Sequence, residues 1–175
     1  MVELITDRTQ YHVTLLNRLR KKPWSSMTAS EQSAWNGEAA KGAYNYTDLN
    51  RVETAVAELA TELGLNLITK TNWSLWDVPV AAEMERYLGN VVSIRDACPG
   101  DIEFPTLPDS MSGLTYEGAN SIEEVLLLVY QNIAEGEHSC VLGKFILGEC
   151  VLGGKIPESK ESDIRCGDIY CGEVL

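Results

Sequence analysis

The feature that most constrains the fold of this chain is a five-residue repeat near its C-terminal end. Residues 140–154 read CVLGKFILGECVLGG, which is three successive units with glycine at the fourth position of each. Two related units, IRCGD and IYCGE, follow at 164–173. Side chains of a regular β-strand alternate between its faces with a period of two, so a period of five needs one break per unit. Glycine permits such a break as a bulge or a corner.

The pattern is similar to the pentapeptide repeats that build β-solenoids, but three units make less than one coil. A solenoid buries its core by stacking coils, so this segment is too short to shield its own leucines. Either it packs on the rest of its own chain, or it docks on other copies or on a partner chain by adding a β-strand. The residues expected to bind a partner are Leu142, Phe145, Leu147, Leu152, Ile169 and Tyr170.

The predicted fold is mainly α, with a helical body of four to five helices at residues 1–136 and a short glycine-rich β tail at 137–175. The clearest helix is expected at 47–64, because apolar residues there step by three and four positions and so share one face. These residues are Leu49, Val52, Val56, Leu59 and Leu63. Gly64 is expected to end this helix in the left-handed conformation that glycine favours.

Weaker patterns predict the other helices of the body. The first is expected at 7–22, with Thr6 or Asp7 as its cap and with Tyr11 and Leu15 on its apolar face. A capping box of the form S/T-x-x-E predicts a short helix after Thr28.

Proline and glycine define the rest of the body. Pro79 is expected at the first position of another helix. A capping-box match at 121–124 is expected within or at the start of the last helix, which has Ile122 and Ile133 on its buried face. Residues 65–76 are predicted to be a short strand or an extended arm. Residues 99–113 contain three prolines and two glycines, which predict a loop.

Composition limits the partners of this chain. The 175 residues carry a formal net charge of −12 at pH 7. Such a surface repels nucleic acid and anionic membranes. The first ten residues lack the basic and apolar segments of a signal peptide, and the apolar run at 125–130 is too short to span a bilayer. The odd number of cysteines, five, is untypical of a secreted disulfide framework and favours synthesis in the cytoplasm with reduced thiols.

No motif in the sequence predicts catalysis. Cys98 and His138 are the only loose pairing of a nucleophile with a base, and neither stands in a setting typical of a cysteine enzyme. His12 is expected to be a surface residue or a satisfied core histidine. Glu123 and Glu124 are expected to be solvated on different sides of their helix. We therefore expect no enzyme activity and no cofactor.

Zinc binding in the tail is an alternative that the sequence leaves open. One histidine and four cysteines gather there, and such side chains are zinc ligands. The gaps between the cysteines do not include the usual two-residue spacing, and buried small side chains explain cysteines in the repeat equally well. These residues are His138, Cys140, Cys150, Cys166 and Cys171. No metal site is predicted.

Tryptophan side chains offer a second candidate surface for a partner. Trp73 and Trp76 flank the expected arm, and tryptophan is enriched among the residues that dominate binding energy at interfaces. A place in the core is the usual alternative for such residues.

Several motifs carry a resemblance that covers about residues 5–133. They are DRTQ at 7–10, Trp24, MT at 27–28, Trp35, GAYNYTDLNRVE at 42–53, RYL at 86–88 and SMSGLTYEGAN at 110–120. Together they resemble uncharacterised structural proteins encoded among the tail and baseplate genes of prophages in Gram-positive, clostridia-like bacteria. The most distinctive motif is GAYNYTDLNRVE.

The resemblance implies a structural component of a phage or of a phage-tail-like particle, made in the bacterial cytoplasm and located in the virion. Expected partners are other tail or baseplate proteins and further copies of the chain, as a trimer or a hexamer, because particles are built from rings. A receptor-binding or fibre-attachment module of the same particle is the first alternative. A small cell-wall hydrolase is the second. The family implies no catalytic residues.

Overall fold

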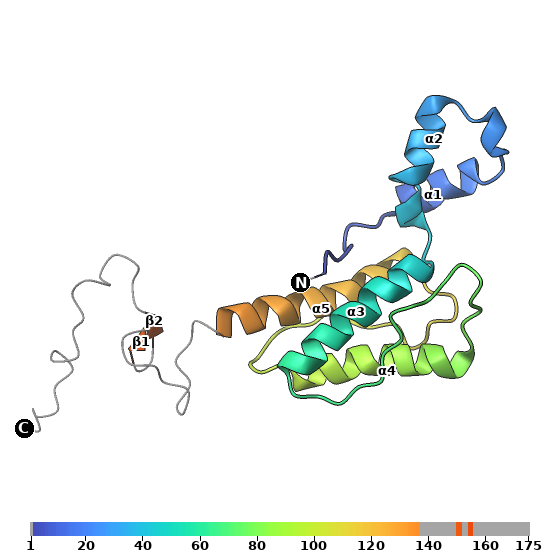
Figure 1. Cartoon of the computed structure of the whole chain (residues 1–175). Helices are drawn as coiled ribbons and strands as arrows, with labels where there is room; N and C mark the ends of the chain where they lie inside the picture. Colours follow the sequence, from blue (N-terminus) through green and yellow to red (C-terminus); the bar gives the residue numbers. More distant parts are fainter. Residues whose placement is uncertain (1, 137–149, 152–153, 156–175) are drawn as a thin grey trace, which may run out of the picture. The chain divides into compact units, whose positions relative to one another are not determined.

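The computed structural model of the chain describes residues 2–136, 150–151 and 154–155 (Figure 1). The chain divides into two units, residues 1–130 and 131–175. In the second unit, β1 (Cys150–Val151) and β2 (Gly154–Lys155) pair antiparallel, with Cys150 opposite Lys155. The partner-binding residues predicted in the repeats all lie outside the described residues. They are Leu142, Phe145, Leu147, Leu152, Ile169 and Tyr170.

The described part of the body is helical, which confirms the mainly α prediction there. Its elements are α1 (Gln10–Leu19), η1 (Trp24–Ser26), α2 (Ala29–Asn36), η2 (Ala40–Gly42), α3 (Tyr46–Glu62), α4 (Ala81–Ala97) and α5 (Tyr116–Gly136). No described helix is both long enough and apolar enough to cross a membrane.

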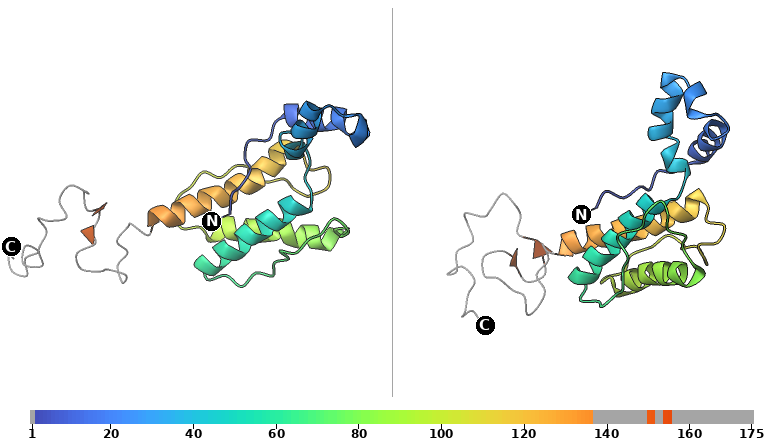
Figure 2. Two further views of the ribbon diagram at one scale, coloured as in Figure 1. Left: turned by 45° about the horizontal axis from the view of Figure 1, so that its top comes forward. Right: turned by 45° about the vertical axis from the view of Figure 1, so that its right-hand side comes forward.

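Helices α3, α4 and α5 lie side by side in both views of Figure 2 and contribute most of the core. Leu49, Val52, Val56 and Leu59 of the predicted stripe are buried in α3, whereas Leu63 follows the helix and is half-buried. The inner faces of α4 and α5 are also buried. Burying one such side chain contributes about 1.5–3 kcal/mol before chain entropy is counted. The fully buried side chains include Val52, Leu59, Tyr87, Val91, Ile94, Ile122, Val125 and Leu126.

A second, smaller core joins α1 and α2. It contains Leu15, Leu19, Met27 and Ala39, with Trp35 packed against it. The expected orientation of Tyr11 is wrong, because its side chain is 62% exposed and the neighbouring His12 is buried instead.

Helix α1 also starts later than predicted, with Thr9 and not Asp7 as its cap. The cause lies in the preceding residues, whose backbone bonds to α5. The Ile5 N–H donates to Glu123 and the Arg8 N–H donates to Asn120. These bonds hold residues 5–8 outside a helix.

The capping predictions were right for α2 and α3 and wrong for α1 and α4. The Thr28 hydroxyl accepts the N–H of Glu31 at the start of α2, and Gly64 after α3 has a φ of 68°. Helix α4, in contrast, begins at Ala81 with Val80 as its cap, so Pro79 stands before the cap and not at the first helical position.

The connection from α3 to α4 is an extended arm without strand structure at residues 65–74. It bonds to both helices. Asn50 of α3 donates to the Trp73 carbonyl and accepts the Trp73 N–H, while Asn90 of α4 donates to the Ile68 carbonyl. The predicted loop at 99–113 is confirmed, since α4 ends at Ala97 and α5 begins at Tyr116.

Candidate functional site

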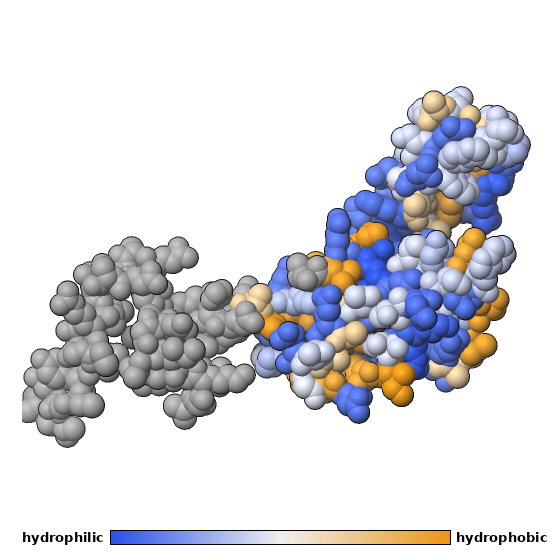
Figure 3. Space-filling view, in the orientation of Figure 1, coloured by the Kyte–Doolittle hydropathy of each residue, from blue (hydrophilic) through white to orange (hydrophobic). Residues whose placement is uncertain are grey.

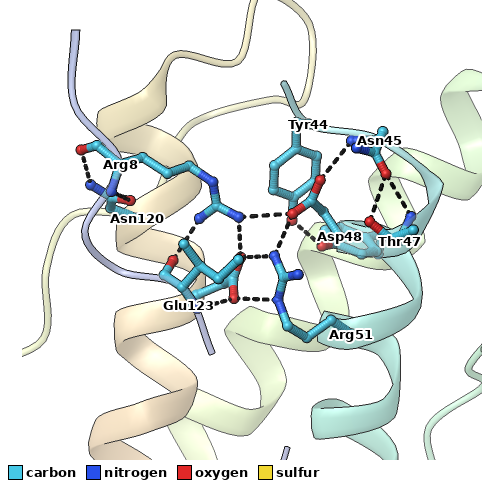
Figure 4. A network of polar contacts seen from close by, with 10 residues as sticks. Arg8, Tyr44, Asn45, Thr47, Asp48, Arg51, Asn120 and Glu123 are labelled. Atoms are coloured by element: carbon cyan, nitrogen blue, oxygen red, sulfur yellow. Dashed lines mark hydrogen bonds and ion pairs between the residues drawn. The ribbon is translucent and has the colours of Figure 1, made fainter. Parts of the chain in front are cut away.

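Four charged side chains meet in the interior of the body (Figure 4). Arg8 comes from the extended N-terminal segment, Asp48 and Arg51 from α3, and Glu123 from α5. Arg8, Asp48 and Glu123 are buried and Arg51 is half-buried, with side-chain exposures between 0 and 15%. We call this set the buried ionic network.

The two arginines share the two carboxylates. Arg8 Nη2 lies 2.9 Å from Asp48 Oδ1 and 2.7 Å from Glu123 Oε1. Arg51 forms a two-pronged pair with Glu123, with Nε 2.8 Å from Oε2 and Nη2 2.8 Å from Oε1, and it also bonds to Asp48. Two positive and two negative groups therefore balance within the network, which a low-dielectric interior requires.

Backbone groups bond to the carboxylates and to one nitrogen of Arg8, whereas Arg8 Nε is buried without a hydrogen-bond partner. The Ile5 N–H lies 2.7 Å from Glu123 Oε2, the Ile5 carbonyl accepts from Arg8 Nη1, and the Asn45 N–H lies 2.8 Å from Asp48 Oδ2. Each carboxylate oxygen thus has a partner inside the fold. A carboxylate in that state has no oxygen turned toward a substrate or a metal ion.

Two tyrosines lie beside the network. The hydroxyls of Tyr44 and Tyr87 share a hydrogen bond, and the Tyr44 ring lies 5.5 Å from the guanidinium carbon of Arg8. Burial raises the pKa of both hydroxyls. Burial lowers the pKa of Arg51, but its hydrogen bonds to Glu123 and Asp48 outweigh that effect and raise it. At neutral pH the tyrosines are neutral and Arg51 is charged.

A second buried pair joins α3 to α4. Glu53 is 1% exposed, and its carboxylate accepts from Arg86 Nη1 at 3.0 Å and Nη2 at 2.6 Å. The Lys70 N–H, in the arm, donates to the same carboxylate at 3.1 Å. This bidentate pair fixes the arm and both helices together.

The sequence motifs on which the expected resemblance was based supply these polar groups. Arg8 belongs to DRTQ, and GAYNYTDLNRVE contributes the residues of α3 and its cap. RYL contributes Arg86 and Tyr87, and Asn120 ends SMSGLTYEGAN. The Asn120 side chain accepts the Arg8 N–H and donates to the Arg8 carbonyl. These polar residues of the motifs thus hold the body together.

The expected solvation of Glu123 is wrong, because its side chain is fully buried, whereas Glu124 is exposed as expected. The sequence contained a signal for this difference. Glu123 borders the apolar stripe that contains Ile122 and Leu126, and an acidic residue at such an edge has to find a positive partner. The partners, Arg8 and Arg51, are 115 and 72 residues away, so no local pattern identifies them.

A cavity of about 440 Å³ lies next to the network. Its wall includes Arg8, Lys41, Tyr44, Thr115 and Glu117. The Lys41 ammonium is paired with Asp7 at 2.6 Å. Among the described residues, no three histidine, cysteine or acidic side chains are grouped to hold a metal ion.

The residues considered for catalysis are not brought together in the described part of the chain. Burial raises the pKa of the Cys98 thiol, and His138 lies outside the described residues. His12 is a satisfied core histidine, one of the two expected settings. Its Nδ1 accepts the Thr9 N–H at 3.0 Å, and its Nε2 lies 2.9 Å from Glu38 Oε2. The cysteines considered for zinc binding lie in the tail, where no side chain is described.

The two tryptophans of the arm have opposite environments. Trp73 is buried, and Lys70 Nζ lies 3.6 Å from the centre of its ring. Trp76 is 88% exposed. It lies in a short segment, residues 74–80, in which every residue is exposed and which we call the apolar turn. Figure 3 shows apolar surface along the right-hand edge, where the α3–α4 connection runs in Figure 1.

Neither a protein-family model nor a curated protein or solved structure matches this chain. The interpretation of the site therefore depends on its own geometry.

Proposed function

We propose that this chain is a structural component of a phage tail, baseplate or tail-like particle, without catalytic activity, that assembles through its C-terminal repeats. The observation that carries the proposal is that every oxygen of the three buried carboxylates is bonded inside the body. A catalytic acid or base has to lie within hydrogen-bond reach of a substrate. The carboxylates of Asp48, Glu53 and Glu123 point instead at the arginines and backbone groups of the body.

The remaining surface chemistry suits contact with other proteins. Four exposed side chains of the apolar turn are large and apolar, namely Leu75, Trp76, Val78 and Val80. The leucines of the repeat need cover that a segment of that length does not supply. Three expectations depend on the resemblance of the motifs. They are a phage or tail-like particle, a trimer or hexamer of this chain, and neighbouring tail or baseplate proteins.

A receptor-binding or fibre-attachment module is a second candidate, and the exposure of Trp76 favours it. An exposed tryptophan next to hydrogen-bonding groups is also suited to stacking on a host surface component. Retention of the full chain on cell walls, lost in Trp76→Ser and kept in Trp24→Ser, would support this candidate over assembly alone.

The assembly proposal is tested by the mass of the full chain in solution. We expect three or six copies by sedimentation velocity, and we expect Leu147→Asp to yield a single copy with an unchanged helical circular dichroism spectrum. Ser159→Asp is the matched control, because it adds the same charge to the tail without removing a leucine. A Leu147→Asp chain that assembles like the unaltered chain would refute the proposal.

A further inference from the structure

We propose that the apolar turn is the receptor for the 140–154 repeat of a neighbouring copy. This inference rests on the proposed assembly function and names the surface to which the repeat binds. It starts from the exposed apolar residues. Of the eight large apolar side chains that are exposed in the described residues, five lie between 68 and 80. They are Ile68, Leu75, Trp76, Val78 and Val80.

The apolar turn is held in place before any partner arrives. The Ser74 N–H donates to Asp77 Oδ2 at 2.7 Å, the Asp77 N–H donates to the Ser74 carbonyl at 3.1 Å, and the Trp76 N–H donates to the Ser74 hydroxyl at 3.3 Å. Asn50 anchors the adjacent Trp73 backbone at 2.7 and 2.8 Å. A pre-ordered loop loses little entropy on binding, which strengthens the contact.

Charge favours an uncharged occupant from the same chain. The run 74–82 reads SLWDVPVAA, and its only charged residue is Asp77, whose carboxylate accepts the Ser74 N–H. The repeat at 140–154 contains one lysine and one glutamate, Lys144 and Glu149, so its formal charge is zero. In a chain with a net charge of −12, these two segments can meet with little repulsion between copies.

The size of the apolar turn favours a peptide segment over a second folded body. A stable interface between folded proteins buries about 800 Å² on each side, whereas one tryptophan supplies about 200 Å². The seven residues of the apolar turn, with their single tryptophan, therefore offer too little area for a folded partner and are suited to binding an extended peptide segment. The ten residues of the repeat ahead of β1, 140–149, can span up to about 35 Å when extended, which is enough to cross the apolar turn of a neighbour.

The test uses the full chain and a matched pair of tryptophan variants. We expect Trp76→Ser to weaken assembly at least about tenfold in sedimentation, as loss of a central aromatic anchor does. Trp24→Ser removes another exposed tryptophan, 50% accessible on η1, and should assemble normally. If Trp76→Ser keeps its helical spectrum and assembles normally while Leu147→Asp is monomeric, the receptor assignment is wrong and the proposed function stands.

Crosslinking provides a second measurement that does not depend on a variant. Lys70 precedes the apolar turn by four residues and its ammonium lies over the Trp73 ring, and Lys144 lies in the repeat. In a mixture of ¹⁴N-labelled and ¹⁵N-labelled chains, a lysine-reactive crosslinker should join Lys70 of one isotope to Lys144 of the other. Crosslinks confined to one isotope, or none between these lysines, would overturn the inference. An unaltered chain that stays monomeric would overturn both the inference and the proposed function.

Discussion

Arg8 Nη2 lies 2.7 Å from Glu123 Oε1, although 115 residues separate the two in the sequence. The bond joins the extended N-terminal segment to the last helix inside the body. Arg51 of α3 bonds to the same carboxylate group of Glu123. Residues 5–8 are therefore an integral part of the fold. Their contribution explains why the start of α1 is displaced to Gln10.

Replacing Glu123 by glutamine should strongly destabilise the body. The substitution keeps the shape of the side chain but leaves the two buried arginines with only the carboxylate of Asp48. Breaking a buried ion pair costs about 3–5 kcal/mol, because an uncompensated charge remains in the interior. Urea denaturation followed by circular dichroism at 222 nm would measure the loss.

Glu124→Gln provides the control for Glu123→Gln, since the same change is made one residue later on the exposed side of α5. Its effect should be within about 0.5 kcal/mol. Equal effects of the two variants would mean that the network contributes nothing to stability.

The pair between Glu53 and Arg86 predicts a similar contrast on α3. Glu53→Gln removes the charge that accepts both Arg86 nitrogens, and we expect a loss of about 2–4 kcal/mol, smaller than in the network because the Arg86 side chain is 24% exposed. Glu62→Gln on the exposed end of the same helix is the control. The measurement is again the free energy of unfolding in urea. A Glu53→Gln chain as stable as the control would show that the pair is dispensable.

Two glycines predict opposite effects of the same substitution. A Cβ at Gly42 would lie 2.3 Å from the carbonyl oxygen of His12, which is backbone that has no room to move aside, so Gly42→Ala should destabilise by about 1–3 kcal/mol. Gly89 lies within α4, where an added Cβ meets nothing within 4 Å. Gly89→Ala should stabilise by about 0.5–1 kcal/mol, because alanine favours the helix. Melting temperatures that move in the same direction for both variants would contradict the assigned packing.

Local patterns predicted the helices and missed the network for a physical reason. The stripe from Leu49 to Leu59 and the capping box at Thr28 are set by residues within two or three turns of each other. The ion pairs join residues that only the folded chain brings together, so their partners are not readable locally. Glu123 illustrates this limit, since its neighbours identify an edge of the core but not the arginines that neutralise it.

The exposure of Trp76 was equally beyond the sequence pattern. Trp73 and Trp76 are three residues apart and chemically identical, and the arm offered no periodicity to separate them. Their difference arises from Asn50, which bonds the Trp73 backbone, and from Asp77, which closes the turn around Trp76. Both interactions depend on where the arm lies against α3.

The start of α4 predicts a pH dependence that a single carboxylate controls. The Val80 N–H donates to Glu83 at 3.1 Å and lowers the pKa of Glu83 below its ordinary value of 4.5, with Lys70 adding to the effect. Because this pKa is depressed in the folded state, its contribution to stability is complete above pH 4.5 and is lost as the pH falls through the folded pKa. Glu83→Gln keeps an acceptor for the Val80 N–H but no longer titrates. The melting temperature of the unaltered chain should therefore exceed that of Glu83→Gln near neutral pH, and the difference should shrink below pH 4.5.

Glu85→Gln, which replaces an exposed carboxylate on the same helix, controls for the loss of one negative charge. A Glu83→Gln difference that stays constant down to about pH 3 would contradict the assigned hydrogen bond.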